Sequence, residues 1–146
     1  MAAPEGFEFA IERGKIHEFA LAVTDDNPLF HDEAIARAKG FASVLAPPTY
    51  AMCASFFQPP GSQAIPEGLD MRYVLHGEQE FIYSRPVVAG EKLYGASKAE
   101  QSFAKEGRRG GTMTFYPIAT EYRDAAGELV LTVRTVTIVT SGTVQE

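Results

Sequence analysis

Residues 50 to 57, Tyr-Ala-Met-Cys-Ala-Ser-Phe-Phe, place the strongest constraint on the fold, because a helix of these residues is apolar nearly all round. Pro48 and Thr49 precede the run, and proline suits a first helical turn since its missing N–H has no helical partner to lose. The segment 59–61, Pro-Pro-Gly, stops it. The sequence therefore predicts a helix that is buried on most sides and needs a layer to cover it.

The second half of the chain carries the strand patterns that can form such a layer. Strands are predicted over residues 78–83, 92–103, 112–123 and 129–140, with a short N-terminal strand over 7–11. Glycine-containing segments connect the last three strands at 107–111 and 124–127. Such connections favour hairpins, so these three strands are expected to form an antiparallel meander.

The first half carries helical patterns. Ile16, Phe19, Ala20 and Val23 follow the spacing of one helix face, which predicts a helix over residues 12–23. The acidic turn at 24–31 ends it. Asp32 can cap a second short helix over 33–39.

Together these elements predict an α+β protein with the hot-dog fold, in which an antiparallel sheet wraps around a long central helix. We expect one domain over residues 1–146, because this is the length of an ordinary domain. Apolar residues make up 45% of the chain, which is enough for a core.

Charge and composition exclude several classes of function. The net charge of −6 argues against nucleic acid as a partner, because phosphate binding needs a basic surface. The uncharged stretch 41–66 is interrupted by prolines, and its apolar part is far shorter than the ~20 residues that a membrane span requires. Cys53 is the single cysteine, and the first residues lack the pattern of a signal peptide, so a cytoplasmic location is expected.

Residues 24 to 32, Thr-Asp-Asp-Asn-Pro-Leu-Phe-His-Asp, form the candidate catalytic segment. A carboxylate and an imidazole held together can remove a proton beside a thioester carbonyl and add or remove water. Acids around Asn-Pro can also be a simple polar turn. His17 lies on the polar side of the first predicted helix, where it is expected to be solvated.

Several segments, in order and spacing, resemble the MaoC-like hydratases and dehydratases, and more closely their FAS1-like dehydratase N-terminal branch. They are residues 15–23 (KIHEFALAV), 25–28 (DDNP), 45–49 (LAPPT), 75–81 (LHGEQEF) and 85–93 (RPVVAGEKL). That branch includes the accessory subunit of heterodimeric 3-hydroxyacyl dehydratases. The resemblance implies a hot-dog fold, dimers and acyl-thioester substrates. Coenzyme A or carrier-protein phosphopantetheine would be part of the substrate, and no separate cofactor is implied.

Active members of the family that this sequence resembles share the motif Asp-x-Asn-Pro-x-His, in which the Asp and the His activate one water. Anchored on Asn27-Pro28, this pattern makes Asp25 the acid and puts Phe30 at the base position. Anchored on Asp-x4-His, it makes Asp26 and His31 the pair. The resemblance therefore gives Asp25, Asp26, Asn27 and His31 as candidate catalytic residues, with two competing frames.

The resemblance also gives candidate substrate-binding residues. Pro48 stands where active members have a backbone N–H that holds the thioester oxygen, and proline has none. The amides of Thr49 and Tyr50 remain as donors one residue later. His76 and Gly77 lie on a predicted strand, from which His76 either reaches a pocket or meets backbone or a dimer interface. The three histidines are too far apart in sequence to suggest a metal site.

Three functions stay open at this level. The first is an (R)-specific enoyl-thioester hydratase, or 3-hydroxyacyl-thioester dehydratase, with a shifted pair. The second is a catalytically silent subunit that binds the acyl group while a paralogous partner supplies Asp and His. The third is a thioester-binding module without lyase activity. In the first two cases the chain is expected to form a homodimer or a heterodimer with a paralogous hot-dog chain.

Overall fold

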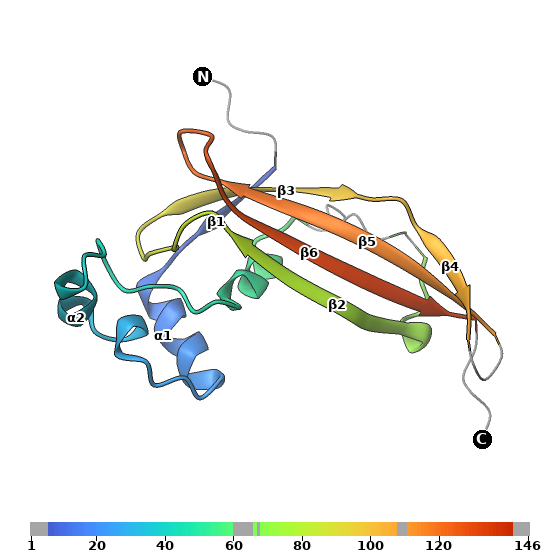
Figure 1. The fold of residues 1–146 in the computed structure, drawn as a ribbon, viewed down its shortest axis with the longest axis horizontal. Coiled ribbons are helices and arrows are strands. Elements are labelled where there is room, and N and C mark those ends of the chain that lie inside the picture. Colours follow the sequence, from blue (N-terminus) through green and yellow to red (C-terminus); the bar gives the residue numbers. More distant parts are fainter. Residues whose placement is uncertain (1–5, 60–65, 67, 108–110, 142–146) are drawn as a thin grey trace.

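The structure is a computed structural model that describes residues 6–59, 66, 68–107 and 111–141 (Figure 1). Its helices are α1 (Arg13–Ala22) and α2 (Glu33–Ala38), with 3-10 helices η1 (Pro28–Phe30), η2 (Tyr50–Phe56) and η3 (Met71–Tyr73). Its strands are β1 (Phe7–Ala10), β2 (Val74–Tyr83), β3 (Lys92–Ala99), β4 (Phe103–Glu106), β5 (Thr112–Arg123) and β6 (Leu129–Thr140). Figure 1 shows α1 and α2 grouped beside one end of the sheet, while the other end, with β4, extends away from them.

The strands form one antiparallel sheet in the order β1-β3-β5-β6-β2, with β4 also paired to β5. The predicted meander of the last three strands is confirmed, except that the predicted strand 92–103 is divided into β3 and β4. Ala99 pairs with Ile118 and Phe103 pairs with Phe115, so three residues of one chain segment oppose two of β5. Pro117 lies at this break. Its missing N–H removes a ladder hydrogen bond and explains why the long strand bends there.

The two N-terminal helices follow the sequence pattern. α1 begins and ends one residue inside the predicted range of 12–23. The Asp32 side chain accepts hydrogen bonds from the N–H groups of Ala34 and Ile35, which caps α2 as expected. The predicted connection at 107–111 lies partly outside the described residues.

Tyr50 joins the helical part of the molecule to the sheet. Its ring stacks on Phe9 of β1 with the centroids 5.8 Å apart, and it meets Phe19 of α1 edge-on at 5.6 Å. The Phe9 ring in turn packs against the ring of Tyr122 of β5, with the centroids 6.0 Å apart. Only 1% of Tyr50 is exposed, so this aromatic cluster forms the centre of the core.

The central helix differs from its prediction, although the hot-dog fold class is confirmed. The described segment η2 has seven residues and 3-10 geometry, not a long α-helix. Its buried residues are Tyr50, Ala51 and Ala54, whereas Phe56 is 87% exposed. A 3-10 helix repeats every three residues, so one narrow side faces the sheet and the other apolar side chains point outward. The expectation of burial on most sides is therefore wrong for the described residues.

Within the described part of the chain, no helix combines the length and hydrophobicity needed to cross a membrane.

Gly95 of β3 leaves room for two aromatic rings that pack over it. It pairs with Phe7 on one side and Tyr122 on the other. A Cβ at this position would lie 2.5 Å from Cζ of Phe7 and 2.9 Å from Cε1 of Tyr122. These two rings meet edge-on at 6.0 Å, so neither can move without disturbing the other.

Gly95→Ala is therefore expected to lower the free energy of unfolding by about 1–3 kcal/mol through overpacking. Gly14→Ala is the matched control, because a Cβ there meets nothing within 4 Å and alanine favours the helix α1. Urea denaturation of both variants checks this. Equal stability of Gly95→Ala and the wild type would show that the two rings yield freely.

Candidate functional site

The acidic turn is held by its own polar side chains. Oδ1 of Asp25 accepts a hydrogen bond from the Asn27 N–H at 3.1 Å. Oδ1 of Asn27 accepts one from the Leu29 N–H at 3.1 Å and so caps η1. Both side chains thus satisfy local backbone donors, which is what the polar-turn interpretation of this segment requires.

His31 uses both of its ring nitrogens inside the protein. Its Nε2 lies 2.8 Å from the backbone oxygen of Asp25, and its Nδ1 lies 2.8 Å from Nδ1 of His17. The two rings are perpendicular, with centroids 4.9 Å apart. A carbonyl oxygen only accepts, so Nε2 of His31 carries its proton. In the neutral ring Nδ1 then accepts from the Nδ1–H of His17, so His31 itself keeps no free lone pair to remove a proton from a ligand. The free lone pair of the two rings is then on Nε2 of His17.

The two histidines border a surface hollow of about 480 Å³. Leu21, Thr24, Asp25 and Asp26 complete its lining. Asp26 is exposed, and its carboxylate makes no hydrogen bond or ion pair with any described residue. His17 was expected only to be solvated, and its contact with His31 was missed because their spacing of 14 residues gives no sequence signal.

Phe30 points away from this hollow and into the core. It is 7% exposed and belongs to the main hydrophobic cluster. In the frame anchored on Asn27-Pro28, Phe30 occupies the base position. The structure therefore turns that position inward, while the next residue, His31, faces the hollow.

The start of η2 offers little as an oxyanion site. The Tyr50 N–H donates to the Pro47 oxygen at 2.9 Å. The carbonyl of Pro48 accepts from the Tyr83 hydroxyl at 2.7 Å. Of the two predicted donors, the Thr49 N–H is the one that makes no hydrogen bond with the described residues. None of residues 48–50 lines the hollow at the acidic turn.

His76 and Gly77 lie on the edge strand β2. The register shifts between His76 and Glu78, which makes Gly77 the extra residue of a bulge. A Cβ on Gly77 would lie 2.6 Å from Cδ1 of Ile138, so a larger residue would not fit without movement. His76 pairs with Thr137 and is exposed. Neither residue lines the hollow at the acidic turn.

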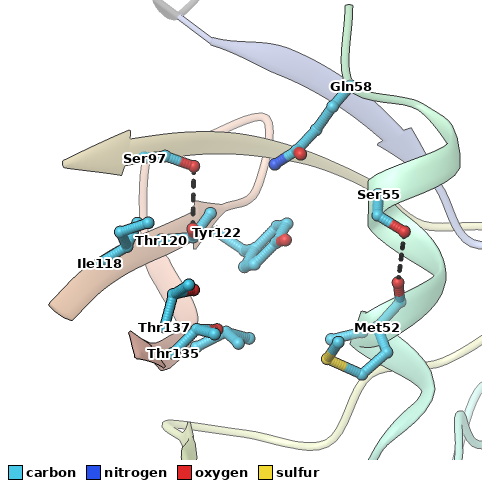
Figure 2. A pocket seen from close by; sticks show the side chains of 11 residues that line it. Met52, Ser55, Gln58, Ser97, Ile118, Thr120, Tyr122, Thr135 and Thr137 are labelled. Carbon is cyan, nitrogen blue, oxygen red and sulfur yellow. Dashed lines mark hydrogen bonds between the residues drawn. The ribbon is translucent and has the colours of Figure 1, made fainter. Parts of the chain in front are cut away.

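A second pocket, of about 180 Å³, lies between η2 and the inner face of the sheet and was missed in the sequence (Figure 2). Six of its lining side chains are polar: Ser55, Gln58, Ser97, Thr120, Thr135 and Thr137. The signal that could have found it is the alternation of Val133, Thr135 and Thr137 along β6, because every second residue of a strand faces the same side.

Among the described residues, no group of three or more His, Cys, Asp and Glu side chains is placed to hold a metal ion.

Phe30→His tests the two frames. We expect it to lower the free energy of unfolding by about 2–4 kcal/mol, because it puts a polar ring into the core. Phe30→Leu keeps the site apolar and should cost less, about 1 kcal/mol. Urea denaturation measures both. A Phe30→His variant as stable as Phe30→Leu, with new hydration activity on an enoyl thioester, would show that the Asn-Pro frame is the functional one.

Tyr50→Phe tests whether the buried Tyr50 hydroxyl lacks a hydrogen-bond partner in the folded protein. This hydroxyl is buried, and the Glu12 backbone is close enough to lower its pKa but not placed for a hydrogen bond of good geometry, so the hydroxyl has no such bond among the described residues. Burial is the main cause that raises the pKa of Tyr50 from 10.0 to about 12, and the nearby Glu12 backbone opposes part of the rise. Removing an unpaired buried hydroxyl is expected to stabilise the protein by about 1 kcal/mol at pH 7.

The same variant should change the response to alkali. The unfolded chain loses the tyrosine proton near pH 10, whereas the folded chain keeps it until about pH 12. The wild type therefore loses stability as pH rises between these values, and Tyr50→Phe should lose less. Thermal unfolding across this range is the measurement. A variant less stable than the wild type at neutral pH would mean that the hydroxyl has a partner.

Comparison with known proteins agrees with this architecture. Residues 2–133 match the family described as "FAS1-like, dehydratase domain region". A UPF0336 protein of Streptomyces avermitilis is 38% identical over 125 residues, covering 85% of this chain and 80% of its own. A UPF0336 protein of Saccharopolyspora erythraea is 34% identical over 139 residues, covering 94% of this chain and 85% of its own.

Solved structures show the same fold. The C-terminally truncated HadBC (3R-hydroxyacyl-ACP dehydratase) complex of Mycobacterium tuberculosis has a chain that matches with a TM-score of 0.71 and 26% identity, over 93% of this chain and 91% of that one. The (R)-hydratase of A. caviae involved in PHA biosynthesis matches with a TM-score of 0.62 and 20% identity, over 89% of both chains, and is similar in fold. The chain belongs to the FAS1-like dehydratase family, a branch of the MaoC-like hot-dog proteins.

Proposed function

We propose that this protein is the acyl-binding subunit of a heterodimeric 3-hydroxyacyl-thioester dehydratase, whose partner chain supplies the catalytic Asp and His. The observation that carries the proposal is the state of His31. Both of its ring nitrogens are engaged, one with the Asp25 carbonyl and one with His17. A general base needs a free lone pair within hydrogen-bond reach of the proton that it removes.

Two further observations support a silent site in this chain. Phe30, at the alternative base position, is buried in the core. Pro48 lacks the N–H at the place where active members hold the thioester oxygen, and Tyr50 uses its own N–H on Pro47. The removal of one such donor typically slows acyl chemistry by about 10²–10³. Base and oxyanion donor are thus both weakened in the same chain.

The edge strand β2 is the surface proposed for the partner. One side of this strand pairs with β6, and the other has no neighbour in the described sheet. Leu75 and Ile82 are each 52% exposed along it. An exposed apolar edge is a template for pairing with another sheet. The related M. tuberculosis dehydratase was likewise crystallised as a complex.

In the proposed assembly the reaction removes water from a 3-hydroxyacyl thioester, or adds it to a 2-enoyl thioester in the reverse direction. The partner's imidazole takes a proton from C2, and the hydroxyl on C3 leaves as water with a proton from the partner site. This chain contributes one half of the dimer and a binding surface for the acyl group. The carrier is coenzyme A or the phosphopantetheine of a carrier protein.

The test compares the chain alone with its mixture with a hot-dog chain that has an intact Asp-x-Asn-Pro-x-His motif. We expect no loss of enoyl absorbance with crotonyl-CoA or longer enoyl-CoAs for the chain alone, and activity for the mixture. In that mixture, His31→Ala should leave the rate within about twofold of the wild type.

Two other outcomes would contradict the proposal. Hydration by the purified chain alone, lost by about 10² or more in His31→Ala, would make His31 a working base and this chain an enzyme by itself. A mixture that forms a complex yet stays inactive would favour a thioester-binding module without lyase activity. Size-exclusion chromatography with light scattering establishes in each case whether the complex has formed.

A further inference from the structure

The pocket between η2 and the sheet is more polar than an alkyl chain requires. Five of the lining residues are apolar or aromatic, and hydroxyl groups from β3, β5 and β6 lie among them. The five are Ala51, Met52, Ile118, Tyr122 and Val133. Figure 2 shows Gln58 reaching from the segment after η2 toward the sheet, so that its amide faces the same space.

Most of the hydroxyls already have partners. Ser97 and Thr120 share a hydrogen bond of 2.9 Å, and Ser55 donates to the Met52 oxygen at 3.0 Å (Figure 2). Thr135 donates to Oε1 of Gln79 at 3.0 Å. The two side chains left without a hydrogen bond to any described residue are Gln58 and Thr137.

Thr137 is the more telling of the two, because it is only 7% exposed. It lies on the inner face between Tyr116 of β5 and His76 of β2, its direct partners in the sheet. Its hydroxyl is not among the fully buried unpaired groups of the described residues, so it keeps access to the pocket. A hydroxyl that faces the pocket and bonds to no described residue can donate to, or accept from, a polar group of a ligand.

We infer that this pocket selects acyl thioesters whose chain carries an oxygen substituent, a hydroxyl or a keto group, beyond the reacting carbons. Thr137 and the Gln58 amide would pair with that oxygen, while Met52 and Ile118 would contact the neighbouring methylenes. The volume of about 180 Å³ holds about six water-sized groups, which suits a segment of chain and not a whole coenzyme. The inference rests on the proposed function, since it names the substrate class of the acyl-binding surface.

The test is a binding measurement that needs no catalysis. Dodecanoyl-CoA and a set of hydroxydodecanoyl-CoA positional isomers are titrated into the wild-type chain by calorimetry. We expect at least one isomer to bind about five- to tenfold more tightly than dodecanoyl-CoA, the gain of one or two hydrogen bonds. Thr137→Val and Gln58→Leu should each reduce this preference and leave the affinity for dodecanoyl-CoA unchanged or higher.

Thr132→Val is the matched control, because Thr132 lies on the same strand but pairs with Glu121 and Ile82, whose side chains face the opposite side of the sheet. It should keep the full preference. Circular dichroism and thermal unfolding verify that all three variants are folded.

The outcomes separate the two proposals. Equal binding of plain and hydroxylated chains, or a preference that survives in both pocket variants, would overturn this inference and leave the acyl-binding function standing. Failure to bind these acyl chains both on coenzyme A and on phosphopantetheine would overturn both. If Thr137→Val and Gln58→Leu bind coenzyme A without an acyl chain more weakly than the wild type does, the pocket binds the amides of the pantetheine arm. The inference is then wrong.

Discussion

The packing of one tyrosine ring determines how the helical half of this molecule meets its sheet. Tyr50 lies between Phe19 of α1 and Phe9 of β1, and through Phe9 it reaches Tyr122 of β5. Aromatic side chains bury the largest areas in a core, so this cluster is where the N-terminal half gains its contact with the strands. The hydroxyl of Tyr50 has no hydrogen-bond partner among the described residues, and a buried donor left in that state costs the cluster some free energy.

The short helix η2 is anchored at its first residue and covers only part of the inner face of the sheet. Tyr50, Ala51 and Ala54 face the core, and the rest of the short helix points outward. A long helix of the kind expected from the sequence would cover the inner face with apolar side chains. The described segment leaves Thr135 and Thr137 lining a pocket. The same feature that departs from the predicted fold thus leaves a pocket on the inner face among the described residues.

The sequence predicted the elements well where a period or a cap defines them. Helix α1 follows from its apolar spacing, the start of α2 from Asp32, and the meander from its glycine-containing connections. It failed where tertiary contacts decide. An apolar run of eight residues indicates a buried helix but does not say whether it is an α-helix or a 3-10 helix. Either type can bury one narrow side of such a run. Pro117 indicates a missing ladder hydrogen bond in β5. The strand that is divided is its partner, between β3 and β4, and the sequence does not say which strand lies opposite Pro117.

The candidate site illustrates how much one residue of register means in a turn. Asp25 and Asn27 each cap a nearby N–H, and this pins the backbone so that Phe30 points inward and His31 outward. The sequence places a histidine one position later than the Asn-Pro frame requires, and the fold accepts it by giving its Nε2 the carbonyl of Asp25 and its Nδ1 a second histidine. An imidazole held at both nitrogens is a structural crosslink between α1 and the turn. A catalytic base needs one of those nitrogens free, so the same two hydrogen bonds that order this turn keep His31 itself from acting as that base.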